Sequence, residues 1–261
     1  MGATVRDIEA IVVELTRGRG YVVLEDLFDG GTVAEARACI LERAATEAPA
    51  VERAAVFDAS GHVWNLVDKG AVFERMVQEP TILKVFSRIL GAEVRLGSFA
   101  AKIVQPGAAP QLPHCDYPYF DLNKAESLPM GLNGSYFMNC QATIMLEDFT
   151  LENGATRVAP ETQVRGRFPI KDEFDRIAVQ TTGPAGSAML MTGLLWHCAG
   201  MNHTDAPRVG ILGQYLPKFV TPLEDQRRGV REAVIARASP ELRSLLGVDD
   251  PYPQVFDPTR A

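Results

Sequence analysis

The stretch VRLGSFAAKIVQPG, residues 94–107, marks a change in the character of the chain. Residues 94–99 and 101–104 are rich in side chains that favour β-strand, and Pro106-Gly107 follows them as a turn signal. This pattern predicts strand that ends at a tight turn. The segments before it favour helix and those after it favour short strands, so we expect the β-rich part of the chain to begin here.

Towards the N-terminus, apolar residues recur at helical spacing. The clearest case is the stretch 4–17, where Gly18 and Gly20 then stop the pattern. Thr32 stands at the start of an Ala-, Glu- and Arg-rich segment and is a candidate helix cap. The predicted helices cover 4–17, 32–46, 70–78 and 80–90, with one short strand over 21–24.

Beyond residue 107 the predicted elements are mostly strands joined by polar loops. Glu152-Asn153-Gly154 predicts a tight turn between two of them. Strands are expected over 135–147, from 156 to 158, and over 187–192, 194–198 and 208–216. A short helix is expected over 171–177, and the charged segment 224–246 is expected to be helical.

Helices first and short strands afterwards predict a mainly β fold with flanking helices, as a sandwich or barrel supported by a helical N-terminal third. A chain of 261 residues with 46% hydrophobic content can form one large domain with ample core. We therefore expect a single domain over 1–261. Its helical support would cover about 1–92, its β-core about 93–217 and its helical tail about 218–261.

The acidic balance of the chain limits its expected partners. The formal net charge is −7 and the pI is about 5.2, whereas nucleic-acid and anionic-lipid binding need basic surfaces. No apolar run approaches the roughly 20 residues that span a bilayer, and the N-terminal segment lacks the apolar core of a secretory leader. The four cysteines form no CxxC pair. We expect reduced thiols and a cytoplasmic protein that binds neither nucleic acid nor membrane.

Two imidazoles and one carboxylate stand where a metal could use them. In an extended backbone, His114 and Asp116 project to one face while Cys115 turns away. Prolines on both sides of this triplet discourage helix. His197 would have to meet the pair from a distant strand. Two histidines and a carboxylate are the ligand set of a mononuclear non-haem iron(II) site, which leaves part of the metal open to other ligands.

Arg208 begins the segment RVGILGQY, residues 208–215, in which neither face is wholly polar. The strand is therefore expected to be largely buried, with one face formed by Arg208, Gly210, Leu212 and Gln214. A buried guanidinium without a carboxylate partner is costly, and no acid stands at an obvious paired position. A dicarboxylate ligand would fill that role through two parallel hydrogen bonds, with Gly210 leaving room for it.

Two other functions fit part of this pattern. A zinc-dependent hydrolase or isomerase could use His114, Asp116 and His197 to activate a water molecule, but it leaves Arg208 unexplained. A non-catalytic binding protein could keep the fold with a vestigial site, because fold does not fix function. His203 fits neither function and is expected to be a loop residue.

Three segments together resemble the phytanoyl-CoA dioxygenase family of iron(II)- and 2-oxoglutarate-dependent oxygenases. Leu112-Pro113-His114-Cys115-Asp116 looks like the family's first metal motif. The run ENGATRVAPET, residues 152–162, resembles its second conserved segment, and the run from Gly186 through Trp196-His197 to Arg208 resembles its ending. The similarity covers roughly residues 94–217.

The resemblance implies a single oxygenase domain with a double-stranded β-helix core, a two-sheet jelly roll of the cupin-like kind. It implies that His114, Asp116 and His197 bind Fe(II), and that Arg208 binds the far carboxylate of the cosubstrate 2-oxoglutarate, with O2 as the second cosubstrate. In some members a glutamine and a threonine also touch 2-oxoglutarate, and Gln111 and Thr156 match those positions. The implied activity is the hydroxylation, desaturation or related C–H oxidation of a small organic substrate.

The chain departs from the family pattern at two places. Members often carry Pro-Gly-Ser-His where this chain has Pro160-Glu161-Thr162-Gln163, and many carry a hydroxyl where it has Ala199. Family relatives that halogenate replace the metal-binding carboxylate with a small residue. Asp116 is present, which favours hydroxylation, desaturation or a related oxidation.

The substrate itself is not encoded in a motif. No basic cluster suits the phosphates of an acyl-CoA, so a small metabolite or a natural-product intermediate is the better expectation. The segment 117–134 lies between two predicted strands and could close over the site, with Tyr117, Tyr119 and Phe120 as candidate substrate contacts. The helical tail could pack on its own chain or in a homodimer.

Overall fold

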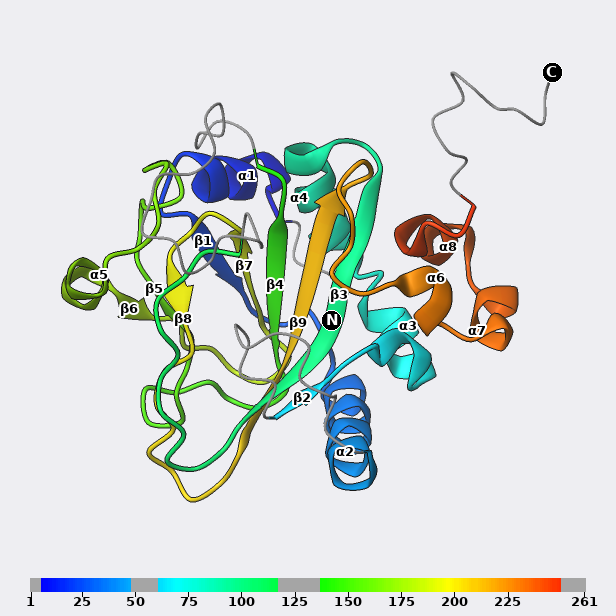
Figure 1. Ribbon diagram of the computed structural model, residues 1–261, viewed down its shortest axis with the longest axis horizontal. Coiled ribbons are helices and arrows are strands. Elements are labelled where there is room, and N and C mark those ends of the chain that lie inside the picture. The colour runs from blue at the N-terminus through cyan, green and yellow to red at the C-terminus, as the bar shows by residue number, and fades with distance from the viewer. Residues whose placement is uncertain (1–5, 48–60, 117–136, 250–261) are drawn as a thin grey trace.

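The computed structural model describes residues 6–47, 61–116 and 137–249. Within these residues the chain has a mixed α/β fold with two antiparallel sheets (Figure 1). The larger sheet has the strand order β1-β7-β4-β9-β3-β2 and the smaller one β6-β5-β8. The larger sheet contains β1 (Tyr21–Leu24), β2 (His62–Val63), β3 (Val94–Val104), β4 (Cys140–Met145), β7 (Ala188–Thr192) and β9 (Arg208–Pro217). The smaller contains β5 (Arg157–Val158), β6 (Val179–Gln180) and β8 (His197–Cys198).

The centre of the larger sheet is the strand β9, which pairs with β3 on one side and β4 on the other. Its alternate residues separate two environments, because successive side chains of a strand point to opposite faces. Arg208, Gly210, Leu212 and Gln214 line a cavity whose wall also includes residues of the smaller sheet. The opposite face is apolar and fully buried. The face pattern predicted for this strand is therefore confirmed.

Helices cover the apolar face of the larger sheet. The helix α4 (Pro80–Leu90) packs its Phe86 ring 5.3 Å from the ring of Tyr215, centre to centre. The Tyr215 hydroxyl donates a hydrogen bond of 2.9 Å to the carbonyl of Val77. This buried hydroxyl is thus satisfied within an otherwise apolar core. The remaining helices are α1 (Ile8–Thr16), α2 (Gly30–Thr46), α3 (Ala71–Met76), α5 (Lys171–Ile177), α6 (Gln226–Gly229), α7 (Glu232–Arg237), α8 (Pro240–Leu246) and the short 3-10 helix Leu66–Asp68.

Most predicted elements occur where the sequence pattern placed them, but three details differ. The cap of α2 is Asp29, whose carboxylate accepts from the Thr32 amide and hydroxyl, so the prediction of Thr32 as the cap was wrong. The segment 94–104 is one strand with a register shift between Leu96 and Ser98. The tail forms three short helices, α6 to α8, and α8 lies against β3 of its own chain.

The helices are more prominent than a mainly β prediction implied, because two of the predicted strands, β5 and β8, are only two residues long. The division into a support, a core and a tail stays a prediction. Within the described ranges, no helix is long and apolar enough to cross a membrane.

Candidate active site

The main chain brings the two predicted histidines together. The amide of His114 donates to the carbonyl of His197 at 3.0 Å, and the amide of His197 donates back to His114 at 2.9 Å. The amide of Asp116 donates to the carbonyl of Gly193 at 2.8 Å. The segment that carries His114 and Asp116 is therefore extended and fixed to the strand β8. Cys115 points away and is 1% exposed in the hydrophobic core, as the two-residue period predicted.

Both imidazoles present the same nitrogen to the cavity. The Nδ1 of His114 lies 2.9 Å from the carbonyl of Leu112, and the Nδ1 of His197 lies 2.9 Å from the carbonyl of Leu195. A carbonyl oxygen only accepts hydrogen bonds, so in each neutral ring Nδ1 carries the proton. The lone pair of each Nε2 is then left free, and this is the tautomer that a metal ligand needs.

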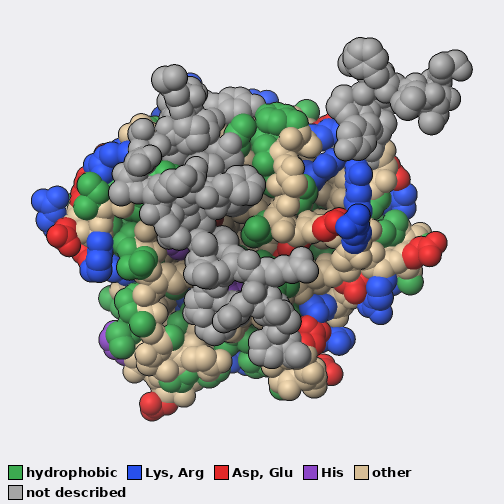
Figure 2. Space-filling model, viewed as in Figure 1, with side chains coloured by type: hydrophobic (Ala, Val, Ile, Leu, Met, Phe, Trp, Pro, Cys, Tyr) green, Lys and Arg blue, Asp and Glu red, His purple; other side chains and the backbone are tan. Residues whose placement is uncertain are grey.

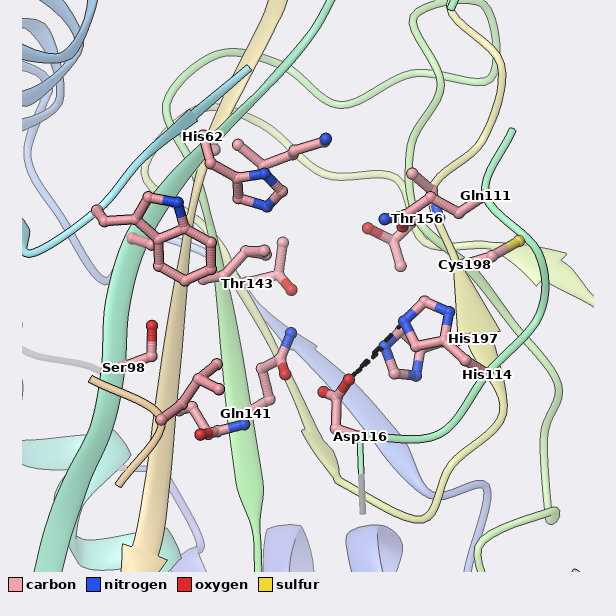
Figure 3. A pocket seen from close by; sticks show the side chains of 18 of the residues that line it. His62, Ser98, Gln111, His114, Asp116, Gln141, Thr143, Thr156, His197 and Cys198 are labelled. Atoms are coloured by element: carbon pink, nitrogen blue, oxygen red, sulfur yellow. Dashed lines mark hydrogen bonds and ion pairs between the residues drawn. The ribbon is translucent and has the colours of Figure 1, made fainter. Parts of the chain in front are cut away.

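The three side chains converge on one point (Figure 3). The Oδ1 of Asp116 lies 3.8 Å from the Nε2 of His114 and 3.5 Å from the Nε2 of His197. With both rings neutral, three electron-pair donors face one another without a proton between them. The second carboxylate oxygen, Oδ2 of Asp116, is buried without a hydrogen-bond partner in the described part of the chain. A divalent cation would accept electron pairs from the three facing donors and would compensate for the missing partner of the Asp116 carboxylate. This donor set therefore fits a metal ion.

Burial keeps His114 in its neutral form. Desolvation and, to a smaller extent, the neighbouring His197 lower the pKa of His114 to about 4, although Asp116 acts in the opposite direction. The ring therefore does not have to lose a proton near neutral pH before its Nε2 can bind a cation.

Arg208 is a buried cation at the start of β9, with 3% of its surface exposed. Its Nε has no hydrogen-bond partner and its guanidinium forms no ion pair among the described residues. Desolvation lowers the pKa of Arg208 to about 10, although Glu147 partly opposes this. The carboxylate of Glu147 instead accepts from the amide of Val209 at 2.9 Å and faces Arg37. A buried guanidinium in this state is suited to a carboxylate ligand from solution.

An aromatic ring supports this guanidinium. The carbon Cζ of Arg208 lies 4.2 Å from the centre of the Phe149 ring, within the range of a cation–π interaction. A Cβ atom at Gly210 would lie 2.8 Å from Cζ of Phe149. The space beside Gly210 was predicted to hold a ligand, but the Phe149 ring occupies it. Gly210 therefore affects Arg208 indirectly, because its missing side chain leaves room for the Phe149 ring that lies against the guanidinium.

The family model for phytanoyl-CoA dioxygenase (PhyH) matches residues 16–210, about three quarters of the chain and the region that includes the triad and Arg208. The chain belongs to the PhyH family. It is an Fe(II)- and 2-oxoglutarate-dependent dioxygenase family enzyme, which disfavours both the zinc hydrolase and the non-catalytic alternative.

Two curated proteins resemble the chain over most of its length. The dioxygenase cdmA of Talaromyces verruculosus is 26% identical over 250 residues, which cover 90% of this chain and 82% of cdmA. The protein Mb1539 of Mycobacterium bovis is 26% identical over 234 residues, covering 87% and 82%. Among solved structures, the epimerase SnoN in complex with Fe3+, alpha ketoglutarate and nogalamycin RO has a TM-score of 0.61 at 20% identity, covering 80% and 83%. This last likeness concerns the fold.

The two residues that match the family's further cosubstrate contacts lie in the same cavity of this PhyH-family chain. The Oε1 of Gln111 accepts from the amide of Ala199 at 3.2 Å, so the side chain is held beside the strand that carries His197. Thr156 is 9% exposed and precedes β5. Both are labelled on the same side of the cavity in Figure 3.

Two residues of the segment that departs from the family pattern, Thr162 and Gln163, have structural roles. Thr162 donates to the carbonyl of Ala159 at 2.7 Å and accepts from the amide of Trp196 at 3.0 Å, so it holds the residue before His197. The Nε2 of Gln163 donates to the carbonyl of Gly18 at 2.9 Å. The segment therefore fixes the metal-binding strand from outside the cavity.

Several cavity residues were not singled out in the sequence. They are His62, Trp64, Ser98, Lys102, Gln141 and Thr143. Strand periodicity could have suggested those on β3 and β4, but nothing in the sequence states which face of either strand meets β9. His203 is exposed and lies in a loop, as predicted. Tyr117, Tyr119 and Phe120 lie outside the described residues.

Proposed function

We propose that this chain uses Fe(II), 2-oxoglutarate and O2 to oxidise a C–H bond of a small organic substrate by hydroxylation, desaturation or a related reaction. One observation carries the proposal above the others. A convergent His-Asp-His triad opens on the same cavity as a buried arginine that has no carboxylate partner among the described residues. A metal site alone would not require that arginine.

The proposed iron ligands are His114, Asp116 and His197, each through the atom that faces the other two. When bound, iron supplies the oxidising chemistry with O2 and 2-oxoglutarate, and the protein binds, orients and shields the reactants. Asp116 brings one negative charge to the site and the neutral rings bring none, so the ligand set leaves a net positive charge that attracts a keto acid. The presence of Asp116 also supports oxidation over halogenation.

The proposed anchor for 2-oxoglutarate is Arg208, through two parallel hydrogen bonds to the carboxylate far from the metal. Phe149 holds the guanidinium from below, so its orientation is set before the ligand arrives. Gln111 and Thr156 are proposed to contact the same molecule from the side of the cavity that carries His197. Burial strengthens each of these interactions, since water is largely excluded.

The proposed architecture of the core is a double-stranded β-helix, with the two antiparallel sheets facing one another across the cavity. The proposed partner is a small molecule rather than nucleic acid or a membrane. The net charge of −7 supports this, and Figure 2 shows acidic and basic side chains interspersed on the face that it draws. The described cysteines are free, in keeping with a reduced, cytoplasmic setting. A homodimer stays a proposal.

The spectrum of the metal site tests this function. Anaerobic protein with Fe(II) and 2-oxoglutarate is expected to develop a weak charge-transfer band in the visible range, because the keto acid chelates the metal. His114→Ala should abolish the band, whereas His203→Ala, which removes an exposed histidine, should keep it. A wild-type spectrum that does not change when both components are added would refute the proposal.

A further inference from the structure

The polarity and charge of the cavity wall change from row to row along the larger sheet. The strands β4, β9 and β3 lie side by side, and their register aligns inward-facing residues in rows. One row is Gln141, Gln214 and Ser98, and we call it the carboxamide row. The next row is Thr143, Leu212 and Ala100. Beyond it come Gly210 and Lys102 as register partners, and then Arg208.

The carboxamide row stands at the end of the cavity opposite Arg208. Gln214 follows Arg208 by six positions on β9, which is about 20 Å at roughly 3.3 Å a position. The carbon chain of 2-oxoglutarate has four C–C bonds and spans at most about 6 Å at about 1.5 Å a bond. A cosubstrate held by Arg208 therefore leaves the carboxamide row free. Figure 3 shows Gln141 and Ser98 on the side of the cavity where Asp116 lies, away from Gln111 and Thr156.

The amides of this row are buried and partly unsatisfied. Gln214 is 6% exposed and Gln141 is 8% exposed. The Oε1 of Gln214 has no hydrogen-bond partner in the described part of the chain. An unsatisfied buried acceptor costs roughly 1–3 kcal/mol, and a ligand group that donates a hydrogen bond to Gln214 from the cavity would relieve this cost. The side chain of Gln141 extends into the cavity beside it (Figure 3).

The charges around this row disfavour an anion. The hydroxyl of Ser98 donates to the carboxylate of Glu224 at 2.7 Å, so its oxygen can only accept from a ligand. Glu224 is the acidic group beside this row, and it would repel a carboxylate or a phosphate. The two amides offer both donors and acceptors without charge. The matching ligand group is therefore neutral and carries both a donor and an acceptor.

The middle of the wall is mostly apolar, although Thr143 stands in the same row as Leu212 and Ala100. Leu212 and Ala100 lie between the carboxamide row and the basic end. Trp64, which stacks on His62 with ring centres 5.0 Å apart, lines the same cavity. A ligand that fills this space presents an apolar body to these side chains, since burying polar groups there would leave them unpaired.

We propose that the carboxamide row recognises the primary substrate, and that this substrate is an uncharged, apolar-bodied molecule with a carboxamide, lactam or alcohol group that binds Gln141 and Gln214. The inference rests on the proposed function, because it assigns the Arg208 end of the cavity to 2-oxoglutarate. It excludes substrates that present a carboxylate, a phosphate or a thioester-linked nucleotide to this end.

The test is a binding screen by ligand-observed NMR on protein loaded with Zn(II) and 2-oxoglutarate, which does not turn over. The probes are ring-bearing carboxamides and alcohols, each matched to the carboxylate of the same skeleton. Binding is expected mainly among the neutral members. Gln141→Leu and Gln214→Leu should each weaken the neutral probes by about tenfold, since one net hydrogen bond contributes roughly 1–1.5 kcal/mol.

Gln180→Leu is the matched control, because it removes a carboxamide on β6, outside the cavity, and should leave probe binding unchanged. Thermal unfolding of each variant checks that it folds. A preference for the carboxylates, an absence of neutral binders, or neutral binding unaffected by both row variants would overturn the inference. Titration with 2-oxoglutarate separates the two proposals. If 2-oxoglutarate binds but the protein shows no preference for the neutral probes, only the recognition role of the carboxamide row fails. If 2-oxoglutarate does not bind, the proposed function fails.

Discussion

Replacing Arg208 with methionine should make the ligand-free protein more stable and make it insensitive to 2-oxoglutarate. The guanidinium is 3% exposed, and desolvation lowers its pKa from 12.5 to about 10. At about 1.4 kcal/mol for each pKa unit, that shift corresponds to about 3 kcal/mol of unfavourable burial. Methionine fills a similar volume without a charge.

The expected gain in stability is smaller than this, because the substitution also removes a favourable contact of Arg208. The contact with the Phe149 ring at 4.2 Å is a desolvated cation–π interaction, and its loss costs about 2 kcal/mol. The net expectation is about 1 kcal/mol of added stability, which raises Tm by roughly 2–4 °C in a chain of this size. In wild type, 2-oxoglutarate at 100 times its Kd should add about 2.7 kcal/mol, and in Arg208→Met almost nothing.

The assay is thermal unfolding with Mn(II) in place of iron, with and without 2-oxoglutarate. The matched control is Arg157→Met, because Arg157 also lies over an aromatic ring, that of Phe174 at 5.1 Å, but is paired with Asp175. This control should lose stability and keep its response to 2-oxoglutarate. The reasoning is refuted if Arg208→Met loses stability without the ligand and still gains as much as wild type with it.

Three further changes probe the surroundings of the site. Phe149→Leu should weaken 2-oxoglutarate binding several-fold in calorimetry while metal binding stays, because the ring supports Arg208 rather than a metal ligand; loss of both would contradict this. Gly210→Ala should destabilise the fold by about 1–3 kcal/mol in denaturant unfolding, since the added Cβ would lie 2.8 Å from Phe149, and Phe149→Leu in the same chain should recover part of that loss. Burial raises the pKa of Glu224 above its ordinary value of 4.5, so the folded state binds the proton more tightly than the unfolded state. Stability from this group is present at low pH and is lost as pH rises through 4.5 and the raised pKa. Glu224→Gln should therefore raise Tm at pH 7, and this advantage should disappear near pH 4; an equal difference at both values would show that the charge is not the cause.

The pattern of single strands allowed much of the site to be predicted. The period of two placed His114 and Asp116 on one face and turned Cys115 into the core, and the same rule gave the cavity face of β9. These features depend on local backbone geometry alone, which a short stretch of sequence encodes. Local structure also sets the neutral tautomer of each histidine, because its Nδ1 lies beside the carbonyl two residues before it.

The carboxamide row could not be predicted, because it depends on register between strands far apart in the chain. Gln141 meets Gln214 only through the pairing of β4 with β9, and a shift of one residue would turn either side chain outwards. The register of β3 also shifts between Leu96 and Ser98, where Gly97 stands, and this shift decides which residue of β3 meets Gln214. The role of Gly210 was misjudged for a related reason, since the Phe149 ring that fills its space comes from a loop sixty-one positions earlier, as the numbering shows.

The paired amide–carbonyl bonds between His114 and His197 have a consequence for how such a centre can change over time. They involve only backbone atoms, so a replacement at either position alters the chemistry offered to the ion and leaves the distance between the two anchor points intact. The backbone and the side chains therefore control different properties of the metal site. Peptide groups determine how far apart the donors stand, and side chains determine which element they prefer and how many coordination places stay open. A fold built in this way can exchange one reaction for another by single substitutions, without first rebuilding its frame.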